Sequence, residues 1–352
     1  MVVDVLVVGQ GICGTFLAWN LENAGLSYKV IDAPLPNTAS KSAAGIINPV
    51  TGRRIVKTWM IDEILPFARQ QYTLLGAQLG ISCIRETDII DFFTSPQMRL
   101  SFLKRHGEDP TFLFKPEDES GWLSHFKYDF GYGVIQPCLQ VELANILATF
   151  RRGLEHKQQL ISGKFDFQKL VIEGNTVSYD DIHASSIVFC DGNEGAVNPF
   201  FKALPFAPNK GEALIVHIPE LPAGHIYKKG LNLAPMGENL FWAGSTYEWD
   251  FKNSHPSEAF RNNTLQLLEN WLRGPVELVD HIASIRPATL ERRPFAGFHP
   301  VHTCVGILNG MGSKGCSLAP YFAMQLVQQI TGQGNIDREA DIQRFRNLLF
   351  RP

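Results

Sequence analysis

The stretch that decides the fold is VLVVGQGICG, residues 5–14. Its apolar residues 5–8 predict a buried strand, and the glycines at positions 9, 11 and 14 follow with the spacing GxGxxG. An amphipathic pattern then predicts a helix to about Glu22, and a second strand, residues 28–31, ends at Asp32. Strand, glycine-rich turn, helix and strand form a βαβ unit with parallel strands, which is how a Rossmann-type domain begins.

Each glycine of this turn has its own use. Gly9 permits the tight bend, Gly11 lets the backbone approach a pyrophosphate, and Gly14 lets the helix pack closely on the strand. The free N–H groups at the helix start would face the phosphates. Asp32 is placed to accept a ribose hydroxyl and would repel a 2′-phosphate, which argues against NADP. The motif leaves NAD and FAD open, as well as a glycine turn in an unrelated α/β protein.

The composition limits the class of protein. A length of 352 residues predicts two domains, and 45% hydrophobic against 19% charged residues excludes a disordered chain. The 32 Lys and Arg against 35 Asp and Glu give a net charge of −3, so no overall basic field attracts nucleic acid. No stretch approaches the roughly 20 apolar residues of a membrane span, and residues 2–8 favour a strand over a signal peptide.

Cysteine and histidine usage gives no sign of a disulfide framework or a metal site. The six cysteines are scattered without a CxxC pair, which favours reduced thiols and a cytoplasmic location. His299 and His302 lie close together with no third ligand nearby, so we interpret them as loop histidines and expect no metal.

The middle of the chain differs from its two ends. Apolar runs at 89–93, 214–218, 226–233 and 240–244 predict strands linked without long helices, as in an antiparallel sheet. The end returns to a strand at 305–308, a glycine-rich turn and a helix at 318–330. The predicted fold is α/β (α+β overall), with the chain crossing several times between a Rossmann-type domain and a mostly antiparallel second domain. The expected limits are 1–77, 137–204 and 281–352 for the first domain, and 78–136 and 205–280 for the second.

Two further segments favour FAD over NAD. In SKSAAGIINP, residues 40–49, small side chains would let a flat ring system lie close to the backbone, with Ile46 on its face. The turn at 310–315 opens a helix whose N-terminus, with Lys314, would stabilise the negative charge that develops on flavin reduction. The alternative is a glycine-rich loop before a core helix, with Lys314 solvated.

Five segments together resemble a known family. GQGICG, SKSAAGIINP, IVFCDG, IRPATLERRPFAG and GMGSKGCSLAP occur in the order seen in the D-amino-acid oxidase-like flavoenzymes. That family includes glycine oxidase, sarcosine oxidase and the oxidase domain of the bifunctional wobble-uridine tRNA modification enzyme. The AAGIINP and GSKG segments are most similar to the last of these.

The resemblance implies that FAD lies extended across the first domain. The positions matching the family's FAD contacts are Gly9, Gly11, Gly14, Asp32, Ser40, Lys41, Ala44, Gly45, Ile46, Phe165, Gly192, Gly312, Ser313, Lys314 and Gly315. Sarcosine oxidases tether the flavin through a cysteine near the strand that is here 282–286. This chain has no cysteine there, so the resemblance implies non-covalent FAD.

Arg286 matches the arginine with which glycine oxidase-like enzymes hold the substrate carboxylate. A planar guanidinium binds a carboxylate with two parallel hydrogen bonds, so it would fix the substrate over the flavin. The alternative is an arginine paired with a structural Asp or Glu. Asn232 and Tyr247 fall at pocket positions where this chain departs from glycine oxidases, so we count them with Arg286 as candidate catalytic residues. Trp242 replaces the sarcosine oxidase lysine thought to help activate oxygen, which points toward a dehydrogenase.

Three functions are compatible with these residues. The first is FAD-dependent oxidation of the C–N bond of a small carboxylate-bearing amine, an amino acid or an N-substituted glycine. The second is FAD-dependent removal of a carboxymethyl group from a modified tRNA uridine, which the net charge of −3 disfavours. The third is a flavin-binding protein without turnover.

Arg53, Arg54 and Lys57 form a basic run that is either a solvated surface or an entry for an anionic substrate. The sequence does not predict the oligomeric state.

Overall fold

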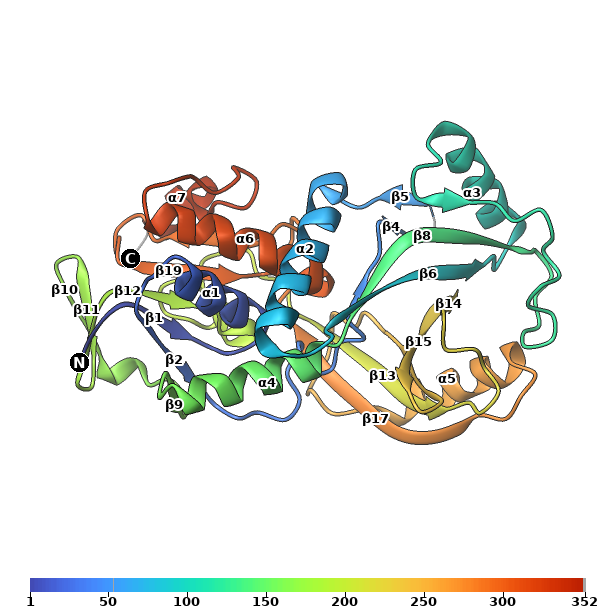
Figure 1. Cartoon of the computed structure of the whole chain (residues 1–352), viewed down its shortest axis with the longest axis horizontal. Helices are drawn as coiled ribbons and strands as arrows, with labels where there is room; N and C mark the ends of the chain where they lie inside the picture. The colour runs from blue at the N-terminus through green and yellow to red at the C-terminus, as the bar shows by residue number, and fades with distance from the viewer. Residues whose placement is uncertain (53, 351–352) are drawn as a thin grey trace.

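The computed structural model describes residues 1–52 and 54–350 and contains two sheets side by side (Figure 1). The parallel core of the first sheet has the order β9-β2-β1-β12-β19. Strand β18 adds to it antiparallel to β19, and the hairpin β10–β11 extends the start of β12. The strands are β1 (Val2–Val8), β2 (Tyr28–Asp32), β9 (Leu160–Ser162), β10 (Leu170–Glu173), β11 (Thr176–Tyr179), β12 (Ile182–Phe189), β18 (Phe295–Phe298) and β19 (Val305–Asn309).

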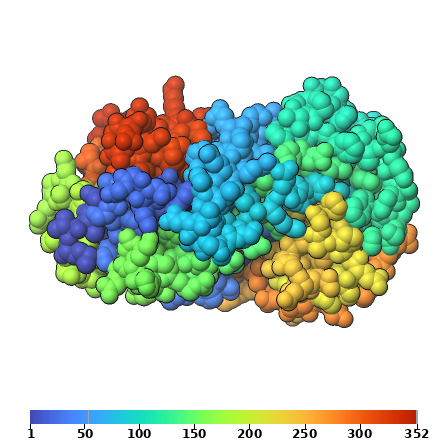
Figure 2. Space-filling view, in the orientation of Figure 1, coloured from blue at the N-terminus to red at the C-terminus, as the bar shows by residue number. Residues whose placement is uncertain are grey.

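Helices from both ends of the chain cover the first sheet. Helix α1 (Ile12–Asn23) lies against α6 (Gly315–Ile330), and α2 (Ile61–Leu79) and α4 (Leu143–His156) pack around this pair. The short α7 (Arg346–Leu349) lies near the C-terminus (Figure 1). The N-terminal and C-terminal segments therefore form one body, and their blue and red surfaces lie next to each other in Figure 2.

The second sheet has the order β17-β13-β16-β15-β14-β6-β8-β3, with β7 paired to β8. All neighbouring strands are antiparallel except β14 and β6. Its strands are β3 (Ile46–Ile47), β6 (Ile84–Phe92), β7 (Leu113–Phe114), β8 (Tyr132–Val141), β13 (Asn209–His217), β14 (Ile226–Lys229), β15 (Leu231–Gly237), β16 (Leu240–Gly244) and β17 (Glu277–Arg286). Helices α3 (Pro96–Glu108) and α5 (Glu258–Trp271) and the hairpin of β4 (Val50–Thr51) and β5 (Val56–Lys57) accompany it.

Alternate residues of the second sheet belong to two different cores, as the period of a strand requires. Ile89, Ile135 and Trp242 join the core shared with α1 and α6. Phe92, Tyr227 and Phe241 point the other way and pack with Trp271 of α5. One face of this sheet is therefore turned toward the first domain, and a site between the sheets can use side chains from both.

The predicted fold class is confirmed, and most predicted strands and helices lie where expected. The single strand expected over 226–233 is two strands, because Gly230 turns the chain at φ +80° between β14 and β15. A 3₁₀ turn, Ile342–Phe345, leads into α7 near the C-terminus. Strand β8 crosses the domain limit expected at 136/137, and β17 crosses the one at 280/281. Among the described residues, no helix is long and apolar enough to cross a membrane.

Candidate functional site

In the glycine-rich turn after β1, two glycines are packed against backbone and the third lies beside a side-chain hydroxyl. A Cβ on Gly9, which has φ +98°, would lie 2.5 Å from the carbonyl oxygen of Cys190. A Cβ on Gly14 would lie 1.8 Å from the carbonyl oxygen of Gly9. Around Gly11 the nearest such atom is the Ser40 hydroxyl at 3.2 Å. The turn can therefore present its backbone to a ligand at Gly11.

Asp32 lies at the end of β2 beside this turn. Its Oδ1 accepts the backbone N–H of Gln10 at 2.7 Å, and its Oδ2 pairs with Nη1 of Arg151 at 2.6 Å. Arg151, on α4, also donates to the hydroxyl of Ser162. Sequence reasoning missed Arg151, because an arginine on an amphipathic helix carries no signal of its partner on a distant strand.

Residues 40–46 lead the chain from the first sheet to the second. The Ser40 hydroxyl accepts the N–H of Ile12 at the start of α1, at 3.1 Å, while the Lys41 ammonium donates to the carbonyl of Leu35. Gly45 has φ +74°, and a Cβ there would lie 1.9 Å from the carbonyl oxygen of Val141. The carbonyl of Ala44 accepts from Gln140, with which Ile46 pairs in the second sheet. The small residues let this segment pass close to β8.

The second glycine-rich turn, residues 310–315, meets the end of β17. Gly312, at φ +57°, donates its N–H to the carbonyl of Pro287 at 3.1 Å, and α6 starts at Gly315. Ser313 is exposed, whereas Lys314 is half-buried. Burial and the nearby Arg293 and Arg292 lower the pKa of Lys314. Among residues 1–52 and 54–350, its ammonium has no hydrogen bond or ion pair, so it is available to a ligand.

Arg286, the last residue of β17, is held by neutral groups alone among the residues that the structure describes. Its Nη1 donates to Oδ1 of Asn209 at 2.8 Å and to the carbonyl of Thr246 at 3.0 Å, and its Nη2 donates to the hydroxyl of Ser245 at 2.7 Å. Its guanidinium carbon lies 4.6 Å from the centre of the Tyr247 ring. Burial lowers the pKa of Arg286.

No carboxylate of the described part of the chain pairs with Arg286, so the alternative of a structural ion pair has no support there. The guanidinium also depends on a glycine beneath it. A Cβ on Gly211 of β13 would lie 1.9 Å from its Nη2.

The other two candidate catalytic residues lie differently. Tyr247 contacts Arg286, and its side chain is 58% exposed. Asn232 is on β15, three strands from β17 and level with Ile282, four residues before Arg286, which puts Asn232 and Arg286 roughly 20 Å apart. The strand register places Asn232 and Arg286 on the face of the second sheet that is turned toward the first domain, without a contact between them. Trp242 lies on this face as well and donates its indole N–H to the carbonyl of Ser42 at 3.0 Å.

The last two candidate cofactor residues are close to the carboxyl end of β12. Phe165 stacks on Tyr179 with 4.8 Å between ring centres. Gly192, at φ +57°, accepts from the side chain of Asn309, which also donates to Asp191. Burial raises the pKa of Asp191 to about 6. Sequence reasoning missed Asn309 and its contacts, which join the ends of β12 and β19.

The expected absence of a metal site remains an expectation, although no cluster of three possible ligands occurs within 1–52 and 54–350. The Nδ1 of His299 accepts the backbone N–H groups of Val301 and His302, as in a histidine with a structural role. In the basic run, Arg53 lies outside the described residues and Arg54 is exposed. Lys57 pairs with Asp62 at 2.9 Å.

Residues 4–329 match the DAO family, FAD dependent oxidoreductase. The chain belongs to this family. The resemblance found in the sequence is thus confirmed, the protein is an FAD-dependent oxidoreductase, and FAD is its cofactor. The residues fit FAD, since the first turn is closed by backbone at Gly9 and Gly14 but not at Gly11, and a half-buried cation, Lys314, has no partner in the described part of the chain.

Solved structures show the same fold at low identity. Glycine oxidase from Geobacillus kaustophilus is 18% identical with a TM-score of 0.79, covering 100% of this chain and 99% of that one. Iminodiacetate oxidase from Chelativorans sp. BNC1 is 17% identical with a TM-score of 0.75, covering 97% and 98%. L-proline dehydrogenase from P. horikoshii is 15% identical with a TM-score of 0.78, covering 98% of each chain.

One curated relative is similar over nearly the whole chain. The tRNA 5-methylaminomethyl-2-thiouridine biosynthesis bifunctional protein MnmC of Idiomarina loihiensis is 23% identical over 354 residues. The match covers 94% of this chain but only 56% of that protein, so this chain spans about half the length of the relative.

Proposed function

We propose that this oxidoreductase oxidises the C–N bond of a carboxylate-bearing amine, an amino acid or an N-substituted glycine, with Arg286 holding the carboxylate. The observation that carries the proposal is the state of Arg286. It is a partly buried guanidinium fixed by three neutral acceptors, with no carboxylate partner among the described residues. Within the described residues, its Nε–H and one Nη2–H have no acceptor and its charge has no counter-ion, so it can still donate to an anionic ligand, and a planar guanidinium favours a carboxylate.

The same proposal assigns roles in cofactor binding. The turn from Gly9 to Gly14 would receive the pyrophosphate at the start of α1, and Asp32 would face the ribose. Residues 40–46 and 312–315 would lie along the flavin, with Lys314 near its pyrimidine edge. FAD, when bound, supplies the acceptor for a hydride.

The chain's own contribution to the reaction is binding and orientation. With its carboxylate on Arg286, the substrate carries its α-carbon at a fixed place, which lowers the entropic barrier of the reaction. The α-carbon loses a hydride, the nitrogen lone pair forms the C=N bond, and the nitrogen loses a proton. Water then adds to the imine, releasing an amine and an oxo acid. Trp242 donates its indole N–H to the carbonyl of Ser42 and carries no charge. We therefore expect an acceptor other than oxygen to reoxidise the flavin efficiently.

The test is anaerobic bleaching of the bound flavin by matched pairs of amines. Glycine, sarcosine, iminodiacetate and D-alanine are compared with their amides, which lack the negative charge. We expect at least one acid to bleach the flavin and its amide to do so at least about a hundredfold more slowly, since the amide cannot use the charge of Arg286. An amide that matches its acid, or a panel in which no acid bleaches the flavin, would contradict the proposal.

A second function, removal of a carboxymethyl group from a tRNA uridine, is favoured by two observations. One is the similarity to MnmC, 23% identical over 354 residues. The other is a pair of exposed aromatic side chains on which a base could stack, Tyr247, which packs on Arg286, and Trp249 two residues further along the chain, at 58% and 56% exposure. Salt-sensitive binding of tRNA and flavin bleaching by the modified nucleoside would support it. Bleaching by free amino acids alone would sink it.

A further inference from the structure

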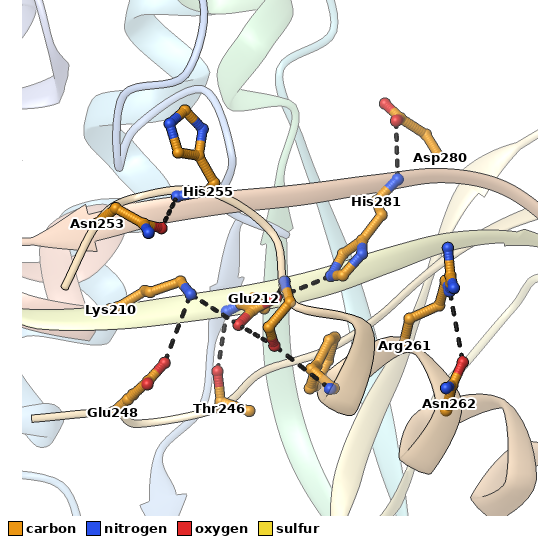
Figure 3. A network of polar contacts seen from close by, with 12 residues as sticks. Lys210, Glu212, Thr246, Glu248, Asn253, His255, Arg261, Asn262, Asp280 and His281 are labelled. Carbon is orange, nitrogen blue, oxygen red and sulfur yellow. Dashed lines mark hydrogen bonds and ion pairs between the residues drawn. The ribbon is translucent and has the colours of Figure 1, made fainter. Parts of the chain in front are cut away.

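Strand β13 uses its two sides differently. Asn209 and Gly211 lie under Arg286, the first as a hydrogen-bond acceptor and the second by leaving room. Lys210 and Glu212 point to the opposite side, where their side chains are only 5% and 1% exposed (Figure 3). Glu212 is thus a buried carboxylate that lies close to the candidate substrate site but faces away from it.

Glu212 binds the far end of the segment 245–257. Its Oε2 accepts the backbone N–H of Ser257 at 2.6 Å, and its Oε1 accepts the Ser257 hydroxyl at 2.8 Å. Lys210 lies 3.0 Å from Oε1, and Nε2 of His281 lies 2.9 Å from Oε2. Burial acts to raise the pKa of Glu212, but the hydrogen bonds from Ser257 and Lys210 outweigh it and hold that pKa below its usual value. Glu212 is therefore a charged carboxylate whose two oxygens both accept hydrogen bonds.

The near end of the segment is tied to the same strand. The backbone N–H of Glu212 donates to the Thr246 hydroxyl at 3.0 Å. Lys210 and Glu248 exchange backbone hydrogen bonds of 2.9 and 3.0 Å, and the Lys210 ammonium lies 3.5 Å from Oε2 of Glu248 (Figure 3). Residues 210–212 therefore hold the segment at both ends.

The first residues of this segment form most of the surroundings of Arg286. The Ser245 hydroxyl and the Thr246 carbonyl accept from its guanidinium, and the Tyr247 ring packs on it. We propose that Glu212 is a positioning residue, which sets the orientation of Arg286, and so the affinity for a carboxylate, by fixing the segment 245–257. This inference rests on the proposed function, and it assigns a role to a residue that touches neither substrate nor flavin.

The test uses the FAD-loaded enzyme and two small probes, acetate and its uncharged counterpart acetamide, with the flavin absorbance reporting binding. In wild type we expect acetate to bind more tightly than acetamide. In Glu212→Gln we expect acetate to bind about tenfold more weakly, with the affinity for acetamide and the FAD content unchanged, because a displaced Arg286 loses the carboxylate geometry. The matched control is Glu277→Gln, which makes the same chemical change at a side chain that is 71% exposed on β17. Its acetate affinity should equal that of wild type.

A second pair of variants covers the case that Glu212→Gln does not fold. Thr246→Val removes the hydroxyl that accepts the backbone N–H of Glu212, so that N–H loses its partner. Thr246→Ser retains the hydroxyl. We expect weaker acetate binding in the valine variant only.

The possible failures are distinct. If wild type does not prefer acetate, the proposed role of Arg286 is wrong. If wild type prefers acetate, but Glu212→Gln and Thr246→Val bind it within about twofold of wild type, Arg286 keeps its role and the positioning role of Glu212 is wrong.

Discussion

The neighbours of Arg286 fix its guanidinium in place and leave its charge free to bind a ligand. An arginine whose partners are an amide, a hydroxyl and a carbonyl keeps its full charge, because none of them neutralises it. The sequence could suggest this residue only through its resemblance to a family. The acceptors that fix it, Asn209, Ser245 and Thr246, are more than 35 residues away and could not be predicted.

Replacing Arg286 should separate charge from geometry. We expect Arg286→Lys to lower kcat/KM for a carboxylate-bearing amine by roughly tenfold to a hundredfold, since lysine retains the charge without the planar fork. Arg286→Met should lower it by roughly a thousandfold, about 4 kcal/mol. Anaerobic reduction kinetics measure both, with Arg69→Lys as the control, since Arg69 is on α2 and pairs with exposed Glu86. A methionine variant within tenfold of wild type would speak against the role of Arg286.

His299 should make stability depend on pH. Burial, and to a lesser extent His302, lowers the pKa of His299 to about 4, and its Nδ1 accepts two backbone N–H groups. The unfolded chain therefore takes up this proton first as the pH falls. The stabilisation by neutral His299 is complete above about pH 6.5 and is lost toward pH 4, by roughly 1 to 2 kcal/mol after solvent screening.

Urea unfolding of wild type and His299→Asn at about pH 7 and about pH 5 measures this contribution. Asparagine keeps an acceptor but does not titrate, so the variant should lose less stability on acidification. Equal losses in the two proteins would show that His299 is not responsible.

At the scale of elements, the sequence predicts those whose pattern is local. Strand β1, its turn and α1 follow from residues 5–22, and β13 and β16 from short apolar runs. Strand β8 escaped prediction because Gly133 and Pro137 interrupt its pattern, and its conformation depends on pairing with β6. Helix α3 has only Phe102 buried, so its apolar period is weak, although Ser95 before Pro96 was a capping signal.

The packing of α1 on β1 predicts opposite effects of the same substitution in two helices. Gly14→Ala should abolish FAD binding or unfold the protein, since its Cβ would meet the Gly9 carbonyl at 1.8 Å. Gly153→Ala, in α4, has nothing within 4 Å of its Cβ and should stabilise the fold by up to about 1 kcal/mol. FAD content and thermal unfolding distinguish the two. Retention of FAD by Gly14→Ala would contradict the packing at this turn.

At the scale of the whole molecule, the candidate cofactor residues come from segments far apart in the chain. Residues 9–14, 40–46, 192 and 312–315 would form one site only because β1, β12 and α6 meet in the first domain. The two-sheet class could be predicted from the change of pattern along the sequence. The contacts of Arg151 with Asp32 and of Asn309 with Asp191 could not, because each joins elements more than 110 residues apart.

A ligand held by distant segments should stabilise the whole molecule. We expect the FAD-loaded protein to exceed the apoprotein in unfolding free energy by about 2.7 kcal/mol at an FAD concentration a hundredfold above its Kd. Calorimetry measures this difference. Acid precipitation should then move all the flavin into the supernatant, because no cysteine lies at 282–286. Colour remaining in the pellet would show a covalent bond and contradict non-covalent binding.

Identifying the product of a single anaerobic turnover tests the central claim, oxidation of a C–N bond in a carboxylate-bearing amine, most directly. The amino acid that bleaches the flavin fastest is mixed with the FAD-loaded enzyme, and the products are quantified against the flavin reduced. We expect one oxo acid and one free amine or ammonia for each flavin, with both much reduced in Arg286→Met. Flavin reduction without release of an amine, or equal yields from Arg286→Met, would contradict it.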